Sequence, residues 1–441
     1  MRTDGFELAG WEKILPPISR YRLRGKTQFE LAVARSFDSR DPRTTIRGNW
    51  NLHEVQVHDQ QSRRRIEDAS AEMVFDGDEA RVTDASFRLG STPMKLQGVL
   101  RNFSDPVFQY VLRSPKVRLA DLHEVAGQPA DAMTAFHATG EIRAGSGTPS
   151  IRNALFVSAG SWQGLPYRNL NAEVVWSATS ITLKKLSLEA LGGDFAASGS
   201  FGISDSNRLP LDVGLRVRNL DLNRLPVSGY FNSSYSLEGR LSIDAQFHGN
   251  GSSWNELGRS LTGKGSAQLS SGVLRNFNLA GAVLSDVNGL PGVVNLVADG
   301  NAAENEAILA KRDTFFDSLE ASFSVEKGRL STQDLVWRTD DYTALGEGWI
   351  DLDRSTRWNA TLVMAPGFSQ LVAQEHRNIR FLLDRNGRLV VPFRVEGTVR
   401  RPQIKPDVKR LAEVIQRGLL GRDSAPRRSA VPKPQQQKKR K

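Results

Sequence analysis

Apolar and polar residues alternate along most of the chain, so that every second side chain is apolar. Leu211, Val213 and Val217 belong to one such run, in which acidic, glycine and basic residues occupy the positions between. Alternation with a period of two predicts strands with one apolar and one polar face, and the polar face favours antiparallel pairing. The pattern recurs at residues 237–247, 358–364 and 389–399.

Turn residues separate these predicted strands. Residues 384–387 read Asp-Arg-Asn-Gly between two apolar segments and predict a hairpin. Lys184 and Lys185 interrupt the alternation around them, which indicates one extra residue and therefore a β-bulge. A weak repeat with a glycine-centred strand occurs at residues 79–119, 180–220 and 328–364, and repeated sheet units favour stacking along one axis.

Helical patterns are few. Residues 254–261 and 277–287 predict short helices, and residues 407–420 predict an amphipathic helix that caps the final strand pair through Val408, Leu411, Ile415 and Leu419. The sequence therefore predicts a mostly β protein, a long curved antiparallel repeat sheet with a few short helices and a C-terminal capping helix.

The predicted division of the chain follows these patterns. We expect an N-terminal β-repeat unit over residues 1–135, a middle β-repeat unit over 136–250, a C-terminal region with the capping helix over 251–421, and a disordered basic tail over 422–441. The tail holds eight basic residues and one acidic residue, so it carries most of the net charge of +10. A broad basic binding face is therefore not expected, and nucleic acid is not an expected partner.

Composition excludes several kinds of site. The chain has no cysteine, which rules out disulfides and thiolate metal sites. Residues 258–264 match most of a phosphate-binding loop, but Gly265 stands where serine or threonine should bind magnesium, and an alternating strand follows instead of a helix. We interpret that segment as a glycine-rich turn. The six histidines lack metal-ligand spacing, so no metal site is predicted. The sequence also contains no nucleophile elbow and no serine–histidine pair in a recognisable context. We therefore expect no catalytic residue, and no cofactor is predicted.

The apolar strand faces allow two interpretations. They can form a closed sandwich core, or an open groove that takes acyl chains, and periodicity alone favours the core. Glycine and alanine are mixed among phenylalanines on these faces, which fits either interpretation. The candidate groove residues are Phe195, Phe201, Leu211, Val213, Leu215, Val217, Leu241, Ile243, Phe247, Leu362 and Val391.

Several short motifs between Gly265 and Leu411 resemble the C-terminal region of AsmA-like envelope proteins. Residues 314–323 fit the pattern T-x-F-x-x-L-x-A-x-F, and residues 346–352 fit G-x-G-x-x-D-L. The spaced glycines and prolines from Asn386 to Asp407 resemble the closing run of that region. Residues 271–279 resemble an earlier segment, although Asn278 replaces the usual acid.

The resemblance implies a periplasmic groove that binds phospholipid and takes part in phospholipid transport or outer-membrane biogenesis, without catalysing a reaction. It also implies an N-terminal anchor in the inner membrane, although the chain as written contains neither a signal peptide nor an apolar stretch of about 18 residues. The alternative is a β-rich envelope scaffold that contacts protein partners and assists outer-membrane protein assembly.

Overall fold

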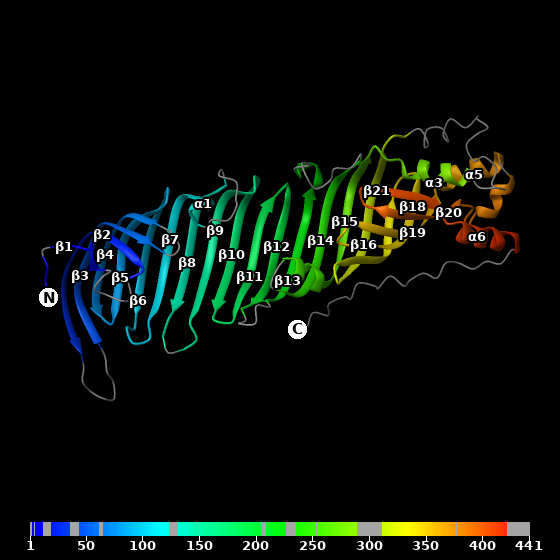
Figure 1. The fold of residues 1–441 in the computed structure, drawn as a ribbon. Coiled ribbons are helices and arrows are strands. Elements are labelled where there is room, and N and C mark those ends of the chain that lie inside the picture. The colour runs from blue at the N-terminus through cyan, green and yellow to red at the C-terminus, as the bar shows by residue number, and fades with distance from the viewer. Residues whose placement is uncertain are drawn as a thin grey trace, which may run out of the picture. The chain divides into compact units, whose positions relative to one another are not determined.

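The computed structural model describes residues 2–3, 5–11, 19–35, 44–60, 65–122, 131–145, 147–203, 209–225, 235–251, 254–288, 311–375 and 377–420. Strands account for 71% of the structure, which confirms the predicted mostly β class. The 21 strands form one antiparallel sheet that does not close on itself (Figure 1). The predicted basic tail lies outside the described residues.

Each strand pairs with its neighbours in sequence, from β1 to β13 and from β14 to β21. Contacts along the chain divide it into two compact units, the first made of Met1–Arg218 with Asn250–Ser252 and the second of Asn219–Gly249 with Ser253–Lys441. The first unit contains β1 (Phe6–Glu7), β2 (Tyr21–Arg35), β3 (Thr44–Asp59), β4 (Arg65–Gly77), β5 (Glu79–Leu89), β6 (Thr92–Arg101), β7 (Val107–Arg118), α1 (Leu119–Leu122), β8 (Ala132–Arg143), β9 (Ser150–Trp162), β10 (Leu165–Ser177), β11 (Ser180–Ala190), β12 (Gly193–Gly202) and most of β13 (Leu209–Asp221).

The second unit joins a shorter run of strands to most of the helices. Its strands are β14 (Ser236–Gly251), β15 (Thr262–Arg275), β16 (Thr314–Glu326), β17 (Arg329–Arg338), β18 (Tyr342–Ile350), β19 (Ser355–Met364), β20 (Val390–Thr398) and β21 (Arg401–Pro406). Its helices are η3 (Leu222–Arg224), α2 (Trp254–Ser260), α3 (Leu279–Asn288), α5 (Pro366–Glu375), η4 (Arg377–Leu382) and α6 (Val408–Leu420). The three helices predicted from the sequence correspond to α2, α3 and α6, whereas α1 and α5 were not predicted.

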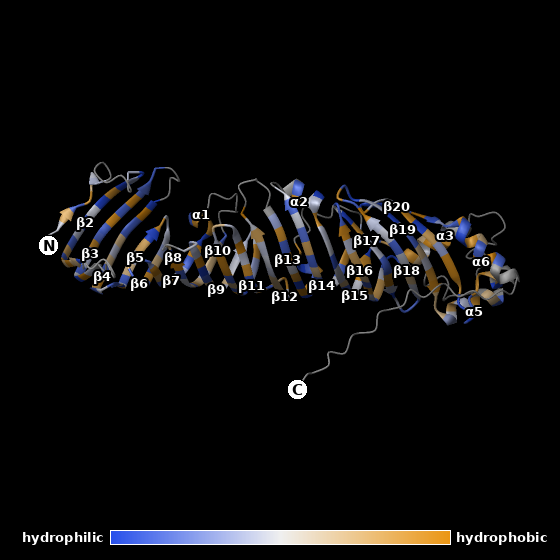
Figure 2. Ribbon diagram, turned by 90° about the horizontal axis from the view of Figure 1, so that it is seen from below, coloured by the Kyte–Doolittle hydropathy of each residue, from blue (hydrophilic) through white to orange (hydrophobic). Residues whose placement is uncertain are grey.

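The strand register keeps apolar side chains on one face of the sheet. On β12 and β13, Phe195 pairs with Val217 and Phe201 pairs with Leu211, so both strands turn their apolar positions to the same side. Apolar and polar bands alternate along the strands in Figure 2. Because side chains in a strand alternate between faces, this register puts the charged positions on the opposite face.

Bulges interrupt many strands without reversing their faces. The pairing of β11 with both β10 and β12 shifts at Lys184–Lys185, which confirms the bulge predicted there. Other strands contain a non-glycine residue with positive φ where the register shifts, such as Asn169 in β10 and Ser271 in β15. An extra residue bends a strand and increases its twist, so repeated bulges curve the sheet.

Helices cover the apolar face of β18–β20 in the second unit. Residues of α3, α5, η4 and α6 pack there around strand residues that are fully or almost fully buried (Figure 1). The centre of this core includes Leu284 on α3, Leu362 on β19, Val391 on β20 and Leu411 on α6, exposed by 2%, 0%, 0% and 3%. This part of the sheet therefore forms a closed hydrophobic core.

Asp407 fixes the start of α6. Its carboxylate is 3% exposed, accepts hydrogen bonds from Nε and Nη2 of Arg394 at 3.0 Å each, and accepts one from the backbone N–H of Arg410 at 3.2 Å. Although burial opposes ionisation, the Arg410 N–H and the Arg394 guanidinium hold the pKa of Asp407 below its usual range. An N-cap carboxylate also satisfies a backbone donor that a helix end leaves free.

The predicted contact face of α6 is confirmed at Leu411 and Ile415, which join the core, but it is wrong at Val408. Val408 is 58% exposed because it is the first residue of the helix, beside the Asp407 cap and before the turn that reaches the core. The side chain of Leu419 lies outside the described residues.

Replacing Leu411 by aspartate should unfold the covered end of the second unit. Burying an unpaired carboxylate at a position that is 3% exposed should cost about 3 kcal/mol or more. Urea unfolding should show this loss, whereas Lys409→Ala on the exposed side of α6 should change stability by less than about 0.5 kcal/mol. Equal stability of the two variants would show that α6 does not close the core.

Candidate functional site

The apolar face of the first unit is organised in cross-strand rows from β5 to β13. Antiparallel pairing brings one residue of each strand into a row, and the rows lie side by side along the strands. In the row that we call the floor row, alanine and leucine are mixed. Its members are Ala85, Leu96, Leu112, Ala138, Leu155, Ala172, Leu186, Ala197 and Leu215.

Two further rows run beside the floor row toward one end of the strands. The glycine row comes first and contains Val82, Gly98, Tyr110, Gly140, Asn153, Val174, Leu183, Gly199 and Val213. The rim row comes next and contains Ala80, Leu100, Phe108, Ile142, Ile151, Trp176, Ile181, Phe201 and Leu211.

The burial of large apolar side chains increases from the rim row, across the floor row, toward α1. Trp176 and Phe201 in the rim row are 52% and 37% exposed. Beyond the floor row, on the other side, Val117 and Val157 are 0% exposed and pack with residues of α1. The apolar face of the first unit is therefore accessible at the rim row and closed near α1, with half-buried leucines between.

Two buried or half-buried carboxylates hold the closed side in place. Asp121 of α1 accepts hydrogen bonds from Ser91 Oγ at 2.9 Å and Thr92 Oγ1 at 2.7 Å. Asp131 is 2% exposed and accepts from the backbone N–H of Gly164 at 3.1 Å, among other donors. These bonds join α1 and the start of β8 to neighbouring turns, so we interpret both carboxylates as structural.

Aromatic rings lie against glycines on neighbouring strands. A Cβ added to Gly160 would lie 2.5 Å from Cζ of its cross-strand partner Tyr167, and one added to Gly265 would lie 2.6 Å from Cζ of Phe323. The same close approach occurs for Gly263 with Phe247, Gly272 with Phe316 and Gly348 with Trp358. Each ring occupies space that a side chain on the glycine would need.

Residues 258–264, which match part of a phosphate-binding loop in sequence, do not form the predicted glycine-rich turn. Gly258 lies in α2, and β15 begins at Thr262, so Gly263 is a strand residue. Gly263 is required because the Phe247 ring lies against it. The strand β15 confirms the alternating strand predicted after this segment, but the predicted glycine-rich turn is wrong.

The structure separates the predicted groove residues into three groups. Phe195, Phe201, Leu211, Val213, Leu215 and Val217 share the apolar face of the first unit, where only Val217 is fully buried. In the second unit Leu241, Ile243 and Phe247 are half-buried, whereas Leu362 and Val391 are 0% exposed beneath the helices. Leu362 and Val391 therefore line a packed core and not an accessible surface.

Sequence reasoning missed the contribution of β6–β10 to the apolar face. Phe108 and Trp176 lie in the rim row, and Tyr110 and Asn153 form a hydrogen-bonded pair in the glycine row. The apolar run of residues 107–112, interrupted by Gln109, was a usable signal for a strand. The pairing of Tyr110 with Asn153 had no such signal, because it depends on the register of three strands.

A separate cavity of about 810 Å³ lies against β5–β11 on the opposite, polar face. Its lining includes residues of the glycine row such as Gly98, Tyr110 and Asn153, and the residues that flank this row along the strands, among them Val99, Val111, Ala154 and Val175. No residue of the floor or rim rows lines it. Neighbours in a strand point to opposite faces, so the cavity opens on the polar face. Arg152, Glu141 and Lys184 are among the charged residues that line it.

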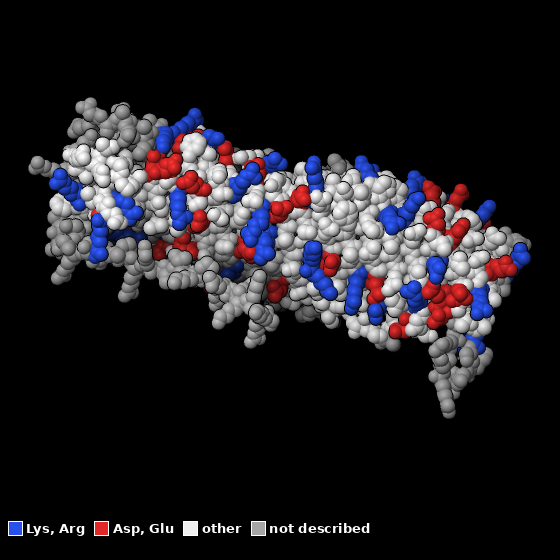
Figure 3. Space-filling view, turned by 180° about the vertical axis from the view of Figure 1, so that it is seen from behind, with Lys and Arg blue, Asp and Glu red and all other residues white. Residues whose placement is uncertain are grey.

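Charged residues on the face shown in Figure 3 are dispersed and not gathered into one patch. Ion pairs between exposed side chains occur across strands, as for Arg101 of β6 with Glu79 of β5 at 3.0 Å, and within one strand, as for Arg143 with Glu141 of β8 at 2.7 Å. A hydrogen bond from Gln109, followed by that from Arg143, lowers the pKa of Glu141. Such exposed pairs contribute little stability, and their mixed signs leave no strong field for one charged ligand.

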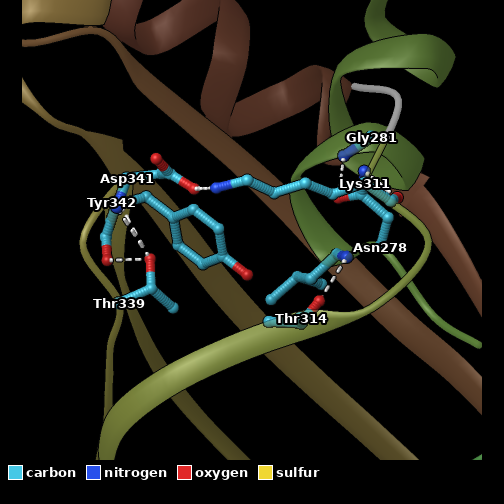
Figure 4. A network of polar contacts seen from close by, with 8 residues as sticks. Asn278, Gly281, Lys311, Thr314, Thr339, Asp341 and Tyr342 are labelled. Atoms are coloured by element: carbon cyan, nitrogen blue, oxygen red, sulfur yellow. Dashed lines mark hydrogen bonds and ion pairs between the residues drawn. The ribbon is translucent and has the colours of Figure 1, made fainter. Parts of the chain in front are cut away.

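A polar network in the second unit explains one motif of the sequence (Figure 4). Thr314 Oγ1 donates to the backbone carbonyl of Phe277 at 2.7 Å and accepts from the N–H of Leu279 at 3.1 Å. Lys311 pairs with Asp341 in the same network. The network joins the start of α3 to β16 and the β17–β18 turn, so the threonine of the T-x-F motif has a structural role.

Neighbouring Tyr342 is 5% exposed, and burial raises the pKa of its hydroxyl above the ordinary value. Within the described part of the chain, no group of three or more histidine, aspartate or glutamate side chains could hold a metal ion. None of the helices in the described ranges is both long enough and apolar enough to cross a membrane.

The described residues define an open antiparallel sheet with an accessible apolar surface in its first unit. The model of the AsmA family matches residues 156–335, which confirms the resemblance expected from the sequence. The match covers less than half of the chain and begins in β9, well before the motifs that carried the resemblance. No curated protein and no solved structure shows significant similarity.

Replacing Gly199 by alanine should destabilise the first unit. A Cβ there would lie 2.2 Å from the carbonyl oxygen of Asp212, so the backbone of β13 must shift. We expect a loss of about 1–3 kcal/mol in the free energy of unfolding. The control is Gly214→Ala on β13, where the nearest atom would be 3.7 Å away and stability should stay within about 0.5 kcal/mol. Similar losses in both variants would contradict a close approach at Gly199.

Proposed function

We propose that the apolar face of the first unit binds the acyl chains of phospholipid and conveys lipid without catalysing a reaction. The observation that supports this most directly is the accessibility of the leucines of the floor row, which stay half-buried, and of the large rim-row side chains Trp176 and Phe201, which are exposed, whereas several alanines of these rows are buried. An apolar surface of this extent is unusual on a soluble protein unless something binds to it.

The chemistry of the rows suits acyl chains. Burying an acyl chain is worth about 0.8 kcal/mol per CH₂, and these contacts have no preferred direction. A chain held by the floor row can therefore slide from strand to strand without breaking a specific bond. Ala197 of that row is half-buried and places a small side chain between Leu186 and Leu215.

The family match suggests association with the cell envelope. We propose a periplasmic location, attachment to the inner membrane in the full-length protein, and a part in phospholipid transport or outer-membrane biogenesis. The resemblance and the apolar face support these proposals together. They require neither a cofactor nor a nucleic acid partner.

Filling the floor row should displace lipid. Ala197→Trp places a large ring among the half-buried leucines, and we expect at least a five-fold loss of phospholipid per protein. Ala196→Trp is the matched control, because Ala196 is the preceding residue of β12 and is exposed on the polar face. Mass spectrometry of lipid that co-purifies with each protein measures the difference.

Wild-type protein without bound lipid, or equal lipid content in both variants, would refute the proposal. Circular dichroism and thermal unfolding of both proteins show whether Ala197→Trp remains folded. If it does not fold, Ala197→Leu provides a smaller obstruction and should lower the lipid content less.

The cavity on the polar face favours a second candidate function, a scaffold that contacts envelope proteins during outer-membrane protein assembly. The apolar part of the cavity lining, at Val99, Val111 and Val175, is half-buried, and charged residues of both signs border it. Apolar centres with polar rims are typical of protein interfaces. The cavity shares glycine-row residues such as Tyr110 and Asn153 with the lipid-binding face but has no floor-row or rim-row residue in its lining. Substitutions in the floor row and at Ala154 therefore test the two functions separately.

Ala154→Trp should obstruct the cavity without reaching the floor row. If the scaffold function is correct, cells with this variant should assemble outer-membrane proteins poorly, while lipid per protein stays at the wild-type level. Ser158→Trp is the control, since Ser158 is exposed on the same face of β9 outside the cavity. Normal assembly with Ala154→Trp would reject the scaffold function.

A further inference from the structure

A polar pair interrupts the apolar face of the first unit. Tyr110 Oη donates a hydrogen bond to Asn153 Oδ1 at 2.5 Å, across β8. The two side chains meet over Gly140, where an added Cβ would lie 2.5 Å from Asn153 Oδ1 and 2.6 Å from Tyr110 Oη. Gly140 therefore provides the space in which a tyrosine on β7 reaches an asparagine on β9.

The pair uses only part of the hydrogen-bonding capacity of Asn153. A carboxamide carries two N–H donors besides its carbonyl, and the described residues provide no acceptor for them. Tyr110 also stacks on Phe108, with ring centroids 5.7 Å apart, and burial raises the pKa of its hydroxyl. The phenol is thus fixed, while the amide donors remain available beside apolar neighbours.

The position of the pair corresponds to a particular depth in a bound lipid. The glycine row lies between the half-buried floor row and the rim row, where Trp176 is 52% exposed. Aromatic residues with a polar tip favour sites where an apolar region meets water, as at a membrane interface. A lipid with its chains on the floor row and its headgroup beyond the rim would place its glycerol esters at the glycine row.

We propose that Asn153, positioned by Tyr110, donates a hydrogen bond to an ester carbonyl of a diacyl glycerophospholipid. This inference rests on the lipid-binding function proposed above and adds its chemical selectivity. The face would then prefer ester-linked lipid to an ether-linked lipid with the same chains and headgroup, because the ether lacks the carbonyl acceptor. The acyl chains would supply most of the affinity and the amide the preference.

Competition between two phosphatidylcholines tests the proposal directly. A fluorescent phospholipid is bound to the full chain and displaced by dioleoyl phosphatidylcholine or by its dioleyl diether analogue. One added neutral hydrogen bond corresponds to about a five-fold preference for the ester in the wild-type protein. Asn153→Leu should abolish the preference, and Tyr110→Phe should reduce it by loosening the amide.

The matched control is Asn49→Leu, the same substitution at an exposed position of β3 on the polar face, which should keep the five-fold preference. Equal binding of ester and ether by the wild type, or an intact preference in folded Asn153→Leu, would overturn the proposal. If the Tyr110–Asn153 pair has a purely structural role, the wild type should bind ester and ether equally, and Asn153→Leu should only lower the melting temperature. If the wild type binds neither the fluorescent phospholipid nor either phosphatidylcholine, the proposed lipid-binding function itself is wrong.

Discussion

The structure depends on an antiparallel register that keeps apolar side chains on one face through strand after strand. A slip of one residue would turn a strand's apolar positions toward water, and bulges make such slips possible at many points. At Lys184–Lys185 the strand β11 contains one extra residue, and its pairing shifts by one position with both β10 and β12. Leu183 and Leu186 therefore remain on the apolar face. The polar pair, the glycine–aromatic contacts and the helical core all lie on the face that this register defines.

Glycine and aromatic residues then set how close the strands and side chains come on that face. A ring lying against a cross-strand glycine covers backbone that would otherwise be exposed, as Phe323 does at Gly265 and Trp358 does at Gly348. Glycine weakens a strand by itself, and the ring compensates with apolar contact. Part of the mixture of glycine and phenylalanine noticed in the sequence is thus a set of cross-strand pairs, such as Gly263 with Phe247 and Gly265 with Phe323, whereas Phe195 and Phe201 pair with aliphatic residues.

This difference explains what could be predicted. The period-two alternation, the Lys184–Lys185 bulge and the amphipathic α6 are local features, and the sequence predicted each of them. Whether an apolar strand position is accessible is not local. Leu362 and Phe201 occupy equivalent places in similar alternating strands, but one is 0% exposed beneath helices and the other 37% exposed. The alternation alone does not contain the helices that cover Leu362, so both residues were predicted to line one groove.

The burial of Leu362 and the exposure of Phe201 follow from one physical requirement. An apolar sheet face must be covered, and in the second unit α3, α5, η4 and α6 supply the cover from the same chain. Among the described residues of the first unit, the short helix α1 covers the side near Val117 and Val157. The floor and rim rows have apolar side chains like those of the covered core, and no described helix packs over them. In the second unit this requirement is met by apolar side chains of the helices, and the proposed complement of the accessible face in the first unit is an apolar ligand of variable shape, the acyl chains of phospholipid.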